Sequence, residues 1–381
     1  MIEVGVGRAI ITPAPQHWPI WLSGYGDRRD PATAVHDDLD VRVVVFRSGG
    51  QRLALVVLDL MAMSIDWANA VRDAVADALQ IEVSAVLTST IHTHAAPSTI
   101  TGTEALGWNV PHNWREDLLA SCCEAALAAD AAARPAELRF ARLGLPAALS
   151  FNRRGHGYTP TYAVVDIVDP GGTSRIATLV NIGVHPVVLG PQNLSVSADW
   201  VGACRHEVER RLGGQTVFVQ GCQGDVDPQG MTWDSGAEAG FAAVERVGED
   251  FALAVVAASA VATPVPESVV VPASMSSSRR SIQLHVGGSP MAAITRRDVL
   301  DVELHEWNVA GVRFVSVPGE GFAALGEAIV SARAPEPTVI VGFAPHWLGY
   351  LPVPFTDGYE ESLSYGAAAV ETIAAALEEI R

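Results

Sequence analysis

Val-Arg-Val-Val-Val-Phe at residues 41–46 and Leu-Ala-Leu-Val-Val-Leu at residues 53–58 are two apolar runs separated by Arg-Ser-Gly-Gly-Gln-Arg. Two such runs around a short glycine-containing turn predict a hairpin of buried strands. A helical pattern of apolar residues follows at residues 65–79. The run 85–87 then leads into Ser-Thr-Ile-His-Thr-His, residues 89–94. The order strand, helix, strand predicts an α/β fold.

Helical patterns and apolar strand runs alternate through the rest of the chain. Helices are expected at residues 114–130, 203–212, 240–260, 321–332 and 367–376, and strands at residues 176–183, 216–220, 281–286, 301–308, 312–317 and 339–342. Residues 255–278 are rich in Ala, Val, Pro and Ser and are expected to be a connection within one domain. We therefore expect a single α/β domain over residues 1–381, with mixed β-sheets flanked by helices.

The charge composition excludes several classes of protein. A net charge of -18 provides no basic face for nucleic acid. Every residue with a fixed positive charge is an arginine, and the absence of lysine excludes Schiff-base enzymes, lysine-bound pyridoxal phosphate and Walker A phosphate loops.

The chain shows neither a signal peptide pattern nor 18 consecutive apolar residues. We expect a soluble cytoplasmic protein without stable membrane association, and the sequence gives no indication of its oligomeric state.

Four predicted strands each place a polar side chain at or just beyond their C-terminal end: His92, His185, Glu320 and Asp225. In open α/β sheets, side chains at the carboxyl ends of strands converge on one crevice. Two histidines and a carboxylate suit zinc and leave a position open for water. Zinc lowers the pKa of that water to about 7. The pattern therefore predicts a zinc site for hydrolysis.

Each of these residues also has a structural interpretation. In an extended segment His92 and His94 point to the same face, which suits one ligand and one acid/base or second-shell neighbour. A histidine near a strand end is often merely hydrogen-bonded. Asp225 could cap a turn, and Glu320 could be a first-turn carboxylate favoured by a helix dipole. Their joint occurrence at four strand ends favours the metal site.

Further motifs are spread along the chain: Gly-Arg-Ala-Ile-Ile-Thr-Pro at residues 7–13, Gly-Tyr at 24–25, His-Thr-His-Ala-Ala-Pro at 92–97, Asn-Arg-Arg at 152–154, Asn-Ile-Gly-Val-His-Pro at 181–186, Pro-Gly-Glu at 318–320, and Tyr350 with Tyr359-Glu360. Their content and order resemble the catalytic domain of the neutral ceramidase family, which has His-Thr-His-Ser-Gly-Pro, Asn-Arg-Ser and Asn-x-x-x-His-Pro at corresponding places. The resemblance extends over residues 6–360 and implies the mixed α/β fold of that domain.

The resemblance also implies a zinc ion with four protein ligands: His92, His185, Glu320 and Tyr350. A metal-bound water would be the nucleophile, and His94 would be its acid/base neighbour. Arg153 and Tyr359 would stabilise the substrate oxygen as negative charge builds up on it. Tyr350 is nominated by the resemblance alone, and simple aromatic packing within residues 347–351 is the alternative.

One motif departs from the family pattern. The family has Gly-Asp-x-Ser-Pro with a serine important for catalysis, whereas this chain has Gly-Asp-Val-Asp-Pro at residues 224–228, which places Asp227 at the serine position. Asp227 could assist the metal-bound water as a base, bind a cationic or hydroxyl group of the substrate, or mark a different reaction. Because the family's additional C-terminal domain and a signal peptide are not expected here, a small or medium soluble amide is a better candidate substrate than a membrane ceramide.

The resulting hypothesis is a ceramidase-like, zinc-dependent amidohydrolase that cleaves a linear amide. Its expected catalytic residues are His94, Arg153, Asp225, Asp227 and Tyr359. Two alternatives stay open. The same scaffold could carry out ester hydrolysis or a lyase or isomerase step, or the chain could be a metal-stabilised binding protein without turnover.

Overall fold

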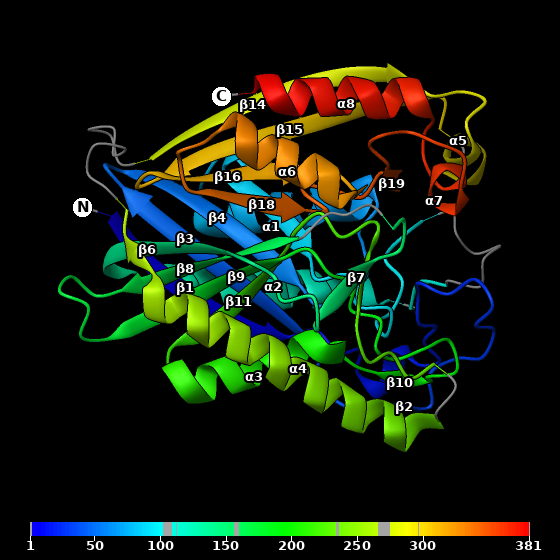
Figure 1. The fold of residues 1–381 in the computed structure, drawn as a ribbon, viewed down its shortest axis with the longest axis horizontal. Helices are drawn as coiled ribbons and strands as arrows, with labels where there is room; N and C mark the ends of the chain where they lie inside the picture. The colour runs from blue at the N-terminus through cyan, green and yellow to red at the C-terminus, as the bar shows by residue number, and fades with distance from the viewer. Residues whose placement is uncertain are drawn as a thin grey trace.

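The structure, a computed structural model, describes residues 2–101, 109–111, 113–155, 160–233, 236–265, 275–295 and 297–380. Its strands form one nine-stranded sheet, one four-stranded sheet and three two-stranded ladders, with helices on the outside (Figure 1). Parallel and antiparallel pairs occur in both large sheets. The predicted α/β class with mixed sheets is confirmed.

The nine-stranded sheet has the order β11-β9-β8-β6-β1-β3-β4-β5, with β13 beside β6. Its strands are β1 (Ile2–Ile10), β3 (Asp40–Ser48), β4 (Gln51–Leu58), β5 (Val86–Thr90), β6 (Arg134–Gly144), β8 (Thr161–Val168), β9 (Arg175–Ile182), β11 (Gln215–Gln220) and β13 (Thr263–Pro264). The predicted hairpin is β3 and β4, with Val45 opposite Ala54. The edge strands β5 and β11 contact each other, so this sheet is strongly curled.

Four helices cover this sheet: α1 (Ile65–Leu79), α2 (Trp114–Ala131), α3 (Asp199–Leu212) and α4 (Gly236–Val261). Helix α2 packs against β1, where a Cβ on Gly5 would lie only 2.0 Å from the carbonyl oxygen of Ala129. Helices α3 and α4 pack against each other and lie on the opposite side of the molecule from α8 (Figure 1). Glycine in β1 therefore permits the close approach of α2.

The four-stranded sheet has the order β14 (Met275–His285), β15 (Val299–Val309), β16 (Val312–Val317) and β18 (Thr338–Gly342). Helices α6 (Ala323–Ala332) and α8 (Ala367–Glu379) lie over it (Figure 1). Strand β18 contacts β5, β9 and β11, and the side chain of Asn181 donates hydrogen bonds to the carbonyls of Val219 (2.9 Å) and Ile340 (2.8 Å). The two large sheets are thus joined where β5 and β11 end.

Short elements complete the chain: η1 (Pro15–His17), β2 (Ala34–Val35), η2 (Val83–Ala85), β7 (Ser150–Asn152), β10 (Ser195–Val196), β12 (Val226–Pro228), α5 (Pro290–Thr295), β17 (Glu320–Gly321), β19 (Tyr350–Leu351) and α7 (Tyr359–Ser362). Helix α6 begins at Ala323 and not at residue 321, because Glu320 and Gly321 pair with β19 instead. The expected connection 255–278 is also shorter: α4 extends to Val261 and β14 begins at Met275, and residues 266–274 lie outside the described residues.

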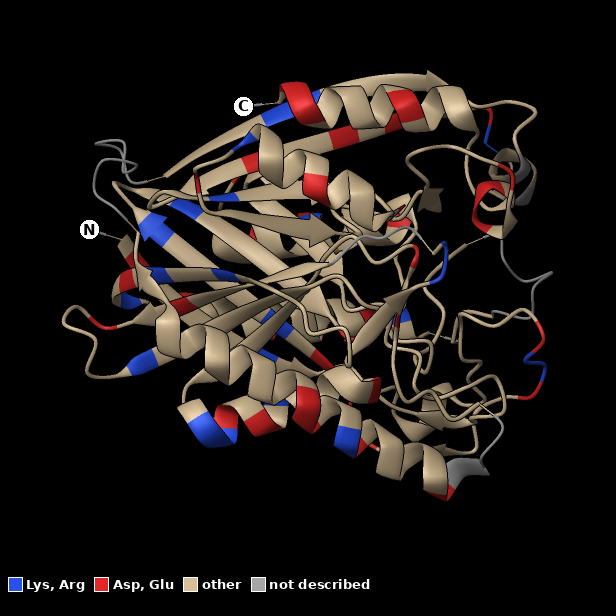
Figure 2. Cartoon of the chain, viewed as in Figure 1, with Lys and Arg blue, Asp and Glu red and all other residues tan. Residues whose placement is uncertain are grey.

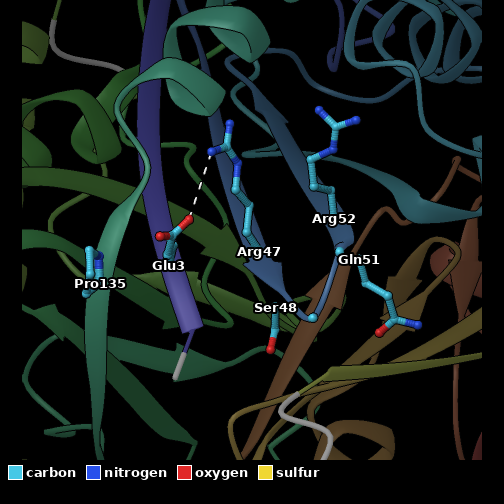
Figure 3. A pocket seen from close by; sticks show the side chains of 8 residues that line it. Glu3, Arg47, Ser48, Gln51, Arg52 and Pro135 are labelled. Carbon is cyan, nitrogen blue, oxygen red and sulfur yellow. Dashed lines mark ion pairs between the residues drawn. The ribbon is translucent and has the colours of Figure 1, made fainter.

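Charged residues are interspersed over the described helices and strands (Figure 2). A surface cavity of about 670 Å³ lies beside the β3–β4 turn (Figure 3). Its arginines are paired: Arg47 lies 2.6 Å from Asp130 and 4.0 Å from Glu3, and Arg52 lies 3.3 Å from Asp130. This cavity is at the opposite end of β4 from the histidine segment. Among the described residues, no helix is long and apolar enough to cross a membrane.

Candidate metal site

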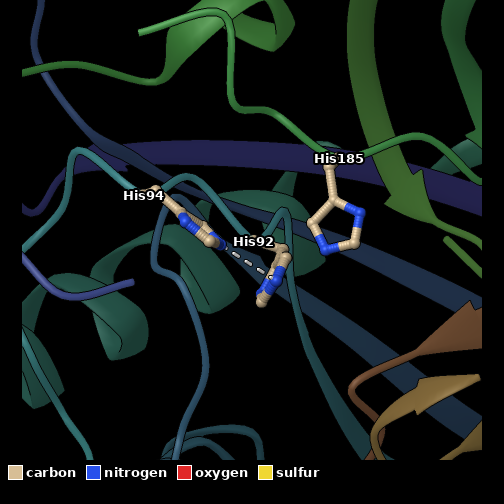
Figure 4. A group of neighbouring side chains, drawn as sticks. All are labelled: His92, His94 and His185. Carbon is tan, nitrogen blue, oxygen red and sulfur yellow. Dashed lines mark hydrogen bonds between the residues drawn. The ribbon is translucent and has the colours of Figure 1, made fainter. Parts of the chain in front are cut away.

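His92 lies just beyond β5, where the backbone turns. Its φ of 71° is unusual for a residue other than glycine, and such conformations persist where surrounding contacts enforce them. The backbone N–H of His92 donates to Leu60 (2.9 Å), and its Nδ1 donates to the carbonyl of Met61 (2.8 Å). The expectation of an extended segment at His92 is therefore wrong. His92 and His94 still converge, with their Nε2 atoms 3.2 Å apart (Figure 4).

His185 follows β9 and is fixed in the same way. Its backbone N–H and its Nδ1 both lie near the carbonyl of Val226, at 3.0 and 3.1 Å. A histidine whose Nδ1 donates to a backbone carbonyl presents the lone pair of Nε2, which is the usual arrangement of a metal-binding histidine. Figure 4 shows the three histidines together, and their candidate ligand atoms lie within 4.8 Å of one another.

Glu320 lies in β17, which follows β16 of the other large sheet and brings this carboxylate close to the histidines. Its Oε2 lies 3.3 Å from Nε2 of His92 and 3.5 Å from Nε2 of His185, while its Oε1 accepts a hydrogen bond from Nε1 of Trp347 (2.9 Å). Oε2 is buried without a hydrogen-bond partner among the described residues. Burial alone would raise the pKa of Glu320, but the positive charge that His92 and His185 carry when protonated outweighs burial and holds this pKa well below its ordinary value.

Tyr350 is brought beside Glu320 because β17 and β19 pair in parallel with these two residues in register. The Tyr350 side chain is buried. Burial raises the pKa of its phenol well above the ordinary value, and the negative charge of Glu320 raises it further. A divalent cation nearby would act in the opposite direction. His92, His185, Glu320 and Tyr350, the four expected ligands, are thus adjacent in space.

His94 is held differently from the other two histidines. A Cβ on Gly24, which has a φ of 105°, would lie 2.4 Å from Cγ of His94, so the glycine lets the loop pack directly on the imidazole. Nδ1 of His94 has no hydrogen-bond partner among the described residues. Burial, and then the charges of His92 and His185, lower the pKa of His94 well below its ordinary value. These effects disfavour the protonated form of His94.

A cavity of about 280 Å³ opens onto this group. It is lined by Gly24, Tyr25, His94, Arg153, His185, Val187, Asp227, Trp233, Tyr350 and Tyr359. Tyr25 meets Trp233 edge to face at 5.5 Å between ring centroids. The Tyr359 side chain is 68% exposed, so it lies at the solvent side of the cavity.

Arg153 and Asp227 form an ion pair in this cavity. Nη1 of Arg153 donates to Oδ1 of Asp227 at 2.6 Å, and Nη2 donates to Oε1 of Glu360 at 3.0 Å and to the carbonyl of Gly224 at 2.5 Å. Burial would lower the pKa of Arg153, but Asp227 and the other anionic groups raise it above its ordinary value. Oδ1 of Asp227 also lies 3.5 Å from Nδ1 of His185. The ion pair therefore touches the candidate metal site.

Asp225 lies next to the site with both carboxylate oxygens occupied. Oδ2 accepts a hydrogen bond from Nδ2 of Asn152 (2.7 Å), and Oδ1 accepts one from the backbone N–H of Ala323 (2.8 Å), the first residue of α6. Such contacts are those of a residue that holds a loop and a helix N-terminus. Asp225 therefore positions the segment that carries Arg153, whose backbone N–H bonds to the Asp225 carbonyl at 2.8 Å.

The origin of the candidate ligands and the presence of two tryptophans at the site were not expected from the sequence. The predicted ligands do not all follow strands of one open sheet, since His92 and His185 follow the nine-stranded sheet and Glu320 follows β16 of the four-stranded sheet. Trp347 and Trp233 were not identified as site residues. No sequence pattern distinguishes a tryptophan that donates to a ligand from one that packs in a core.

No protein-family model matches the chain, and no curated protein is similar to it in sequence. Its structure is similar to that of neutral ceramidase from Pseudomonas aeruginosa, with a TM-score of 0.81, 15% sequence identity, and coverage of 100% of this chain and 74% of that chain. A solved structure of a ceramidase complexed with C2 gives the same values. The chain therefore has a neutral ceramidase-like fold, as its motifs predicted.

Proposed function

We propose that this chain, with its neutral ceramidase-like fold, is a zinc-dependent hydrolase of linear amides. The observation that carries the proposal is the buried Oε2 of Glu320, which has no hydrogen-bond partner among the described residues and faces Nε2 of both His92 and His185. A buried carboxylate oxygen without a partner is costly. A divalent cation bound by these three atoms would satisfy all of them.

The donor set fits zinc. Imidazole nitrogen and carboxylate oxygen are its usual ligands, and the Nδ1 atoms of His92 and His185 are held by backbone carbonyls, as metal-binding histidines usually are. Tyr350 completes the proposed set. A bound zinc ion would polarise an amide carbonyl. It would also lower the pKa of bound water, so that hydroxide is available as the nucleophile at neutral pH.

The surrounding residues have distinct proposed roles. His94 lines the cavity beside His92, so it is placed to take a proton from the attacking water and pass it to the leaving amine. Arg153 and Tyr359 also line the cavity and can donate hydrogen bonds to the amide oxygen as it gains negative charge. Asp225 is assigned a positioning role, because both of its oxygens are occupied.

The cavity volume of about 280 Å³ lies at the lower end of the range for small-molecule pockets. We therefore propose a small or medium soluble amide as the substrate. We separately propose a cytoplasmic location. We also propose that residues 1–381 act as one domain, since the ligands follow strands of both large sheets.

Metal analysis combined with hydrolysis of an N-acyl amide panel tests this proposal. We expect about one zinc ion per chain, loss of turnover after chelation and recovery on adding zinc. His92→Ala and His185→Ala should lose both zinc and turnover, whereas His206→Ala, at an exposed position of α3, should retain both. Full turnover in zinc-free protein, or zinc binding that survives both substitutions, would overturn the proposal.

A further inference from the structure

We propose that Asp227 selects against substrates with a negative charge next to the scissile amide, so that the preferred substrates are N-acylated neutral or cationic amines and not N-acylated amino acids. This inference rests on the proposed function and names the substrate class for the same site.

The Asp227 carboxylate is close to the reaction centre. It lines the cavity, and its Oδ1 lies 3.5 Å from Nδ1 of His185, whose Nε2 faces Glu320 on the other side of the ring. One imidazole ring therefore separates Asp227 from the proposed metal position. A substrate whose amide lies at that position has its nearest substituents within reach of the Asp227 charge.

The positive charge of Arg153 is already balanced. Among the described residues that line the cavity, Arg153 is the one with a fixed positive charge. Its two terminal nitrogens donate to the carboxylates of Asp227 and Glu360, so two negative charges surround one guanidinium. Glu360 is shared with Arg154, at 2.9 Å, but Arg154 also pairs with Glu361. Together these two arginines and three carboxylates have a net charge of -1.

This arrangement still allows Arg153 to act on a neutral amide. A guanidinium has five N–H donors, and the contacts to Asp227, Glu360 and the Gly224 carbonyl use three of them. The remaining donors can bond to an amide oxygen. A substrate carboxylate beside Arg153 would instead meet the net negative charge of this group of arginines and carboxylates, and like charges repel more strongly in a partly buried site than in bulk water.

The charge at position 227 separates this chain from the resembled ceramidase pattern. A serine hydroxyl there would leave Arg153 paired with Glu360 and would remove the excess negative charge. The aromatic ring of Trp233 in the same cavity favours apolar or cationic groups, and a chain net charge of -18 attracts cations. These features all disfavour an anionic substrate.

Three amides with the same acyl group test the inference: N-hexanoylglycine, N-hexanoylethanolamine and N-hexanoylethylenediamine, which are anionic, neutral and cationic. With zinc-loaded protein, we expect kcat/KM for the glycine amide to be at least about tenfold below that for the ethanolamine amide. The ethylenediamine amide should equal or exceed the ethanolamine amide. Asp227→Asn keeps the shape of the side chain and removes its charge. In this variant, the ratio of kcat/KM for the ethanolamine amide to kcat/KM for the glycine amide should be about tenfold smaller than in the wild type.

Asp250→Asn is the matched control, since it removes an exposed carboxylate of α4 that does not line the cavity. It should leave the ratio unchanged. A general loss of turnover lowers kcat/KM for both amides by the same factor and leaves their ratio unchanged. Asp227→Asn therefore tests the inference even if its overall activity is low. A preference for the glycine amide, or an unchanged ratio in Asp227→Asn, would overturn the inference.

Calorimetric binding of the three amides to the zinc-loaded protein separates this inference from the proposed function. If no amide is cleaved but the ethanolamine amide binds about tenfold more tightly than the glycine amide, and Asp227→Asn removes that difference, the proposed function fails and the charge selection stands. Equal binding of all three amides would refute the charge selection.

Discussion

Removal of the indole N–H of Trp347 should weaken zinc binding without unfolding the protein. Nε1 of Trp347 donates to Oε1 of Glu320 at 2.9 Å, which leaves Oε2 as the oxygen that faces His92 and His185. A hydrogen bond to a charged group contributes about 1.5–3 kcal/mol, and each 1.4 kcal/mol changes an equilibrium constant about tenfold. Trp347→Phe should therefore raise the Kd for zinc about 10- to 100-fold, the range typical of residues that orient a metal ligand.

Titration of metal-free protein with zinc, in competition with a chelating dye of known affinity, measures this Kd. Trp307→Phe is a suitable control, because Trp307 is fully buried and its Nε1 has no hydrogen-bond partner among the described residues. This control makes the same change of side chain and should leave the Kd for zinc unchanged. The reasoning is refuted if Trp347→Phe binds zinc within about twofold of the wild type, or if Trp307→Phe weakens binding equally.

Gly24→Ala places a Cβ 2.4 Å from Cγ of His94 and should displace this imidazole. We expect kcat to fall about 10- to 100-fold with zinc content unchanged. An unaltered kcat would contradict the close packing of Gly24 on His94. Arg205→Leu leaves the buried Asp59 without the guanidinium that contacts it at 2.5 and 2.7 Å, and the free energy of unfolding in urea should fall by about 3–5 kcal/mol. A loss below about 1 kcal/mol would contradict this reasoning. Burial, and then the Arg72 charge, lower the pKa of His346 to about 3. The unfolded chain therefore binds a proton near pH 6.5 that the folded chain accepts only near pH 3, and stability falls as the pH falls through this window. Between about pH 7 and pH 5, the free energy of unfolding of the wild type should therefore fall by about 2 kcal/mol more than that of His346→Leu. An identical pH dependence in both proteins would contradict the assignment.

The strand and helix patterns predicted some buried elements and missed others: the largely buried strands β1 and β8 were not predicted. The β3–β4 hairpin and α1 lie where the apolar runs place them, because their side chains are packed in the core. Strand β6 was not predicted. Its residues alternate between buried and partly exposed positions and include three arginines, so it lacks the apolar run of a buried strand.

The candidate site was predicted in part for the same reason. His92, His185 and Glu320 each follow an apolar run, and the carboxyl end of a buried strand is where a polar side chain can leave the core. Tyr350 follows no such run and was nominated only by the motif resemblance. Its place beside Glu320 depends on the pairing of β17 with β19, a contact between segments that are separated by α6 and β18.

The sequence by itself determined the α/β class and the histidine and carboxylate set, because these depend on local periodicity and residue type. The exchange of serine for Asp227 is visible only against the motif of the resembled family. Only the tertiary structure decided that the candidate ligands follow strands of two sheets, that Trp347 donates a hydrogen bond to Glu320, and that Arg153 is shared between Asp227 and Glu360. Such contacts join residues far apart in the chain, and their distances depend on how the sheets pack rather than on any local pattern.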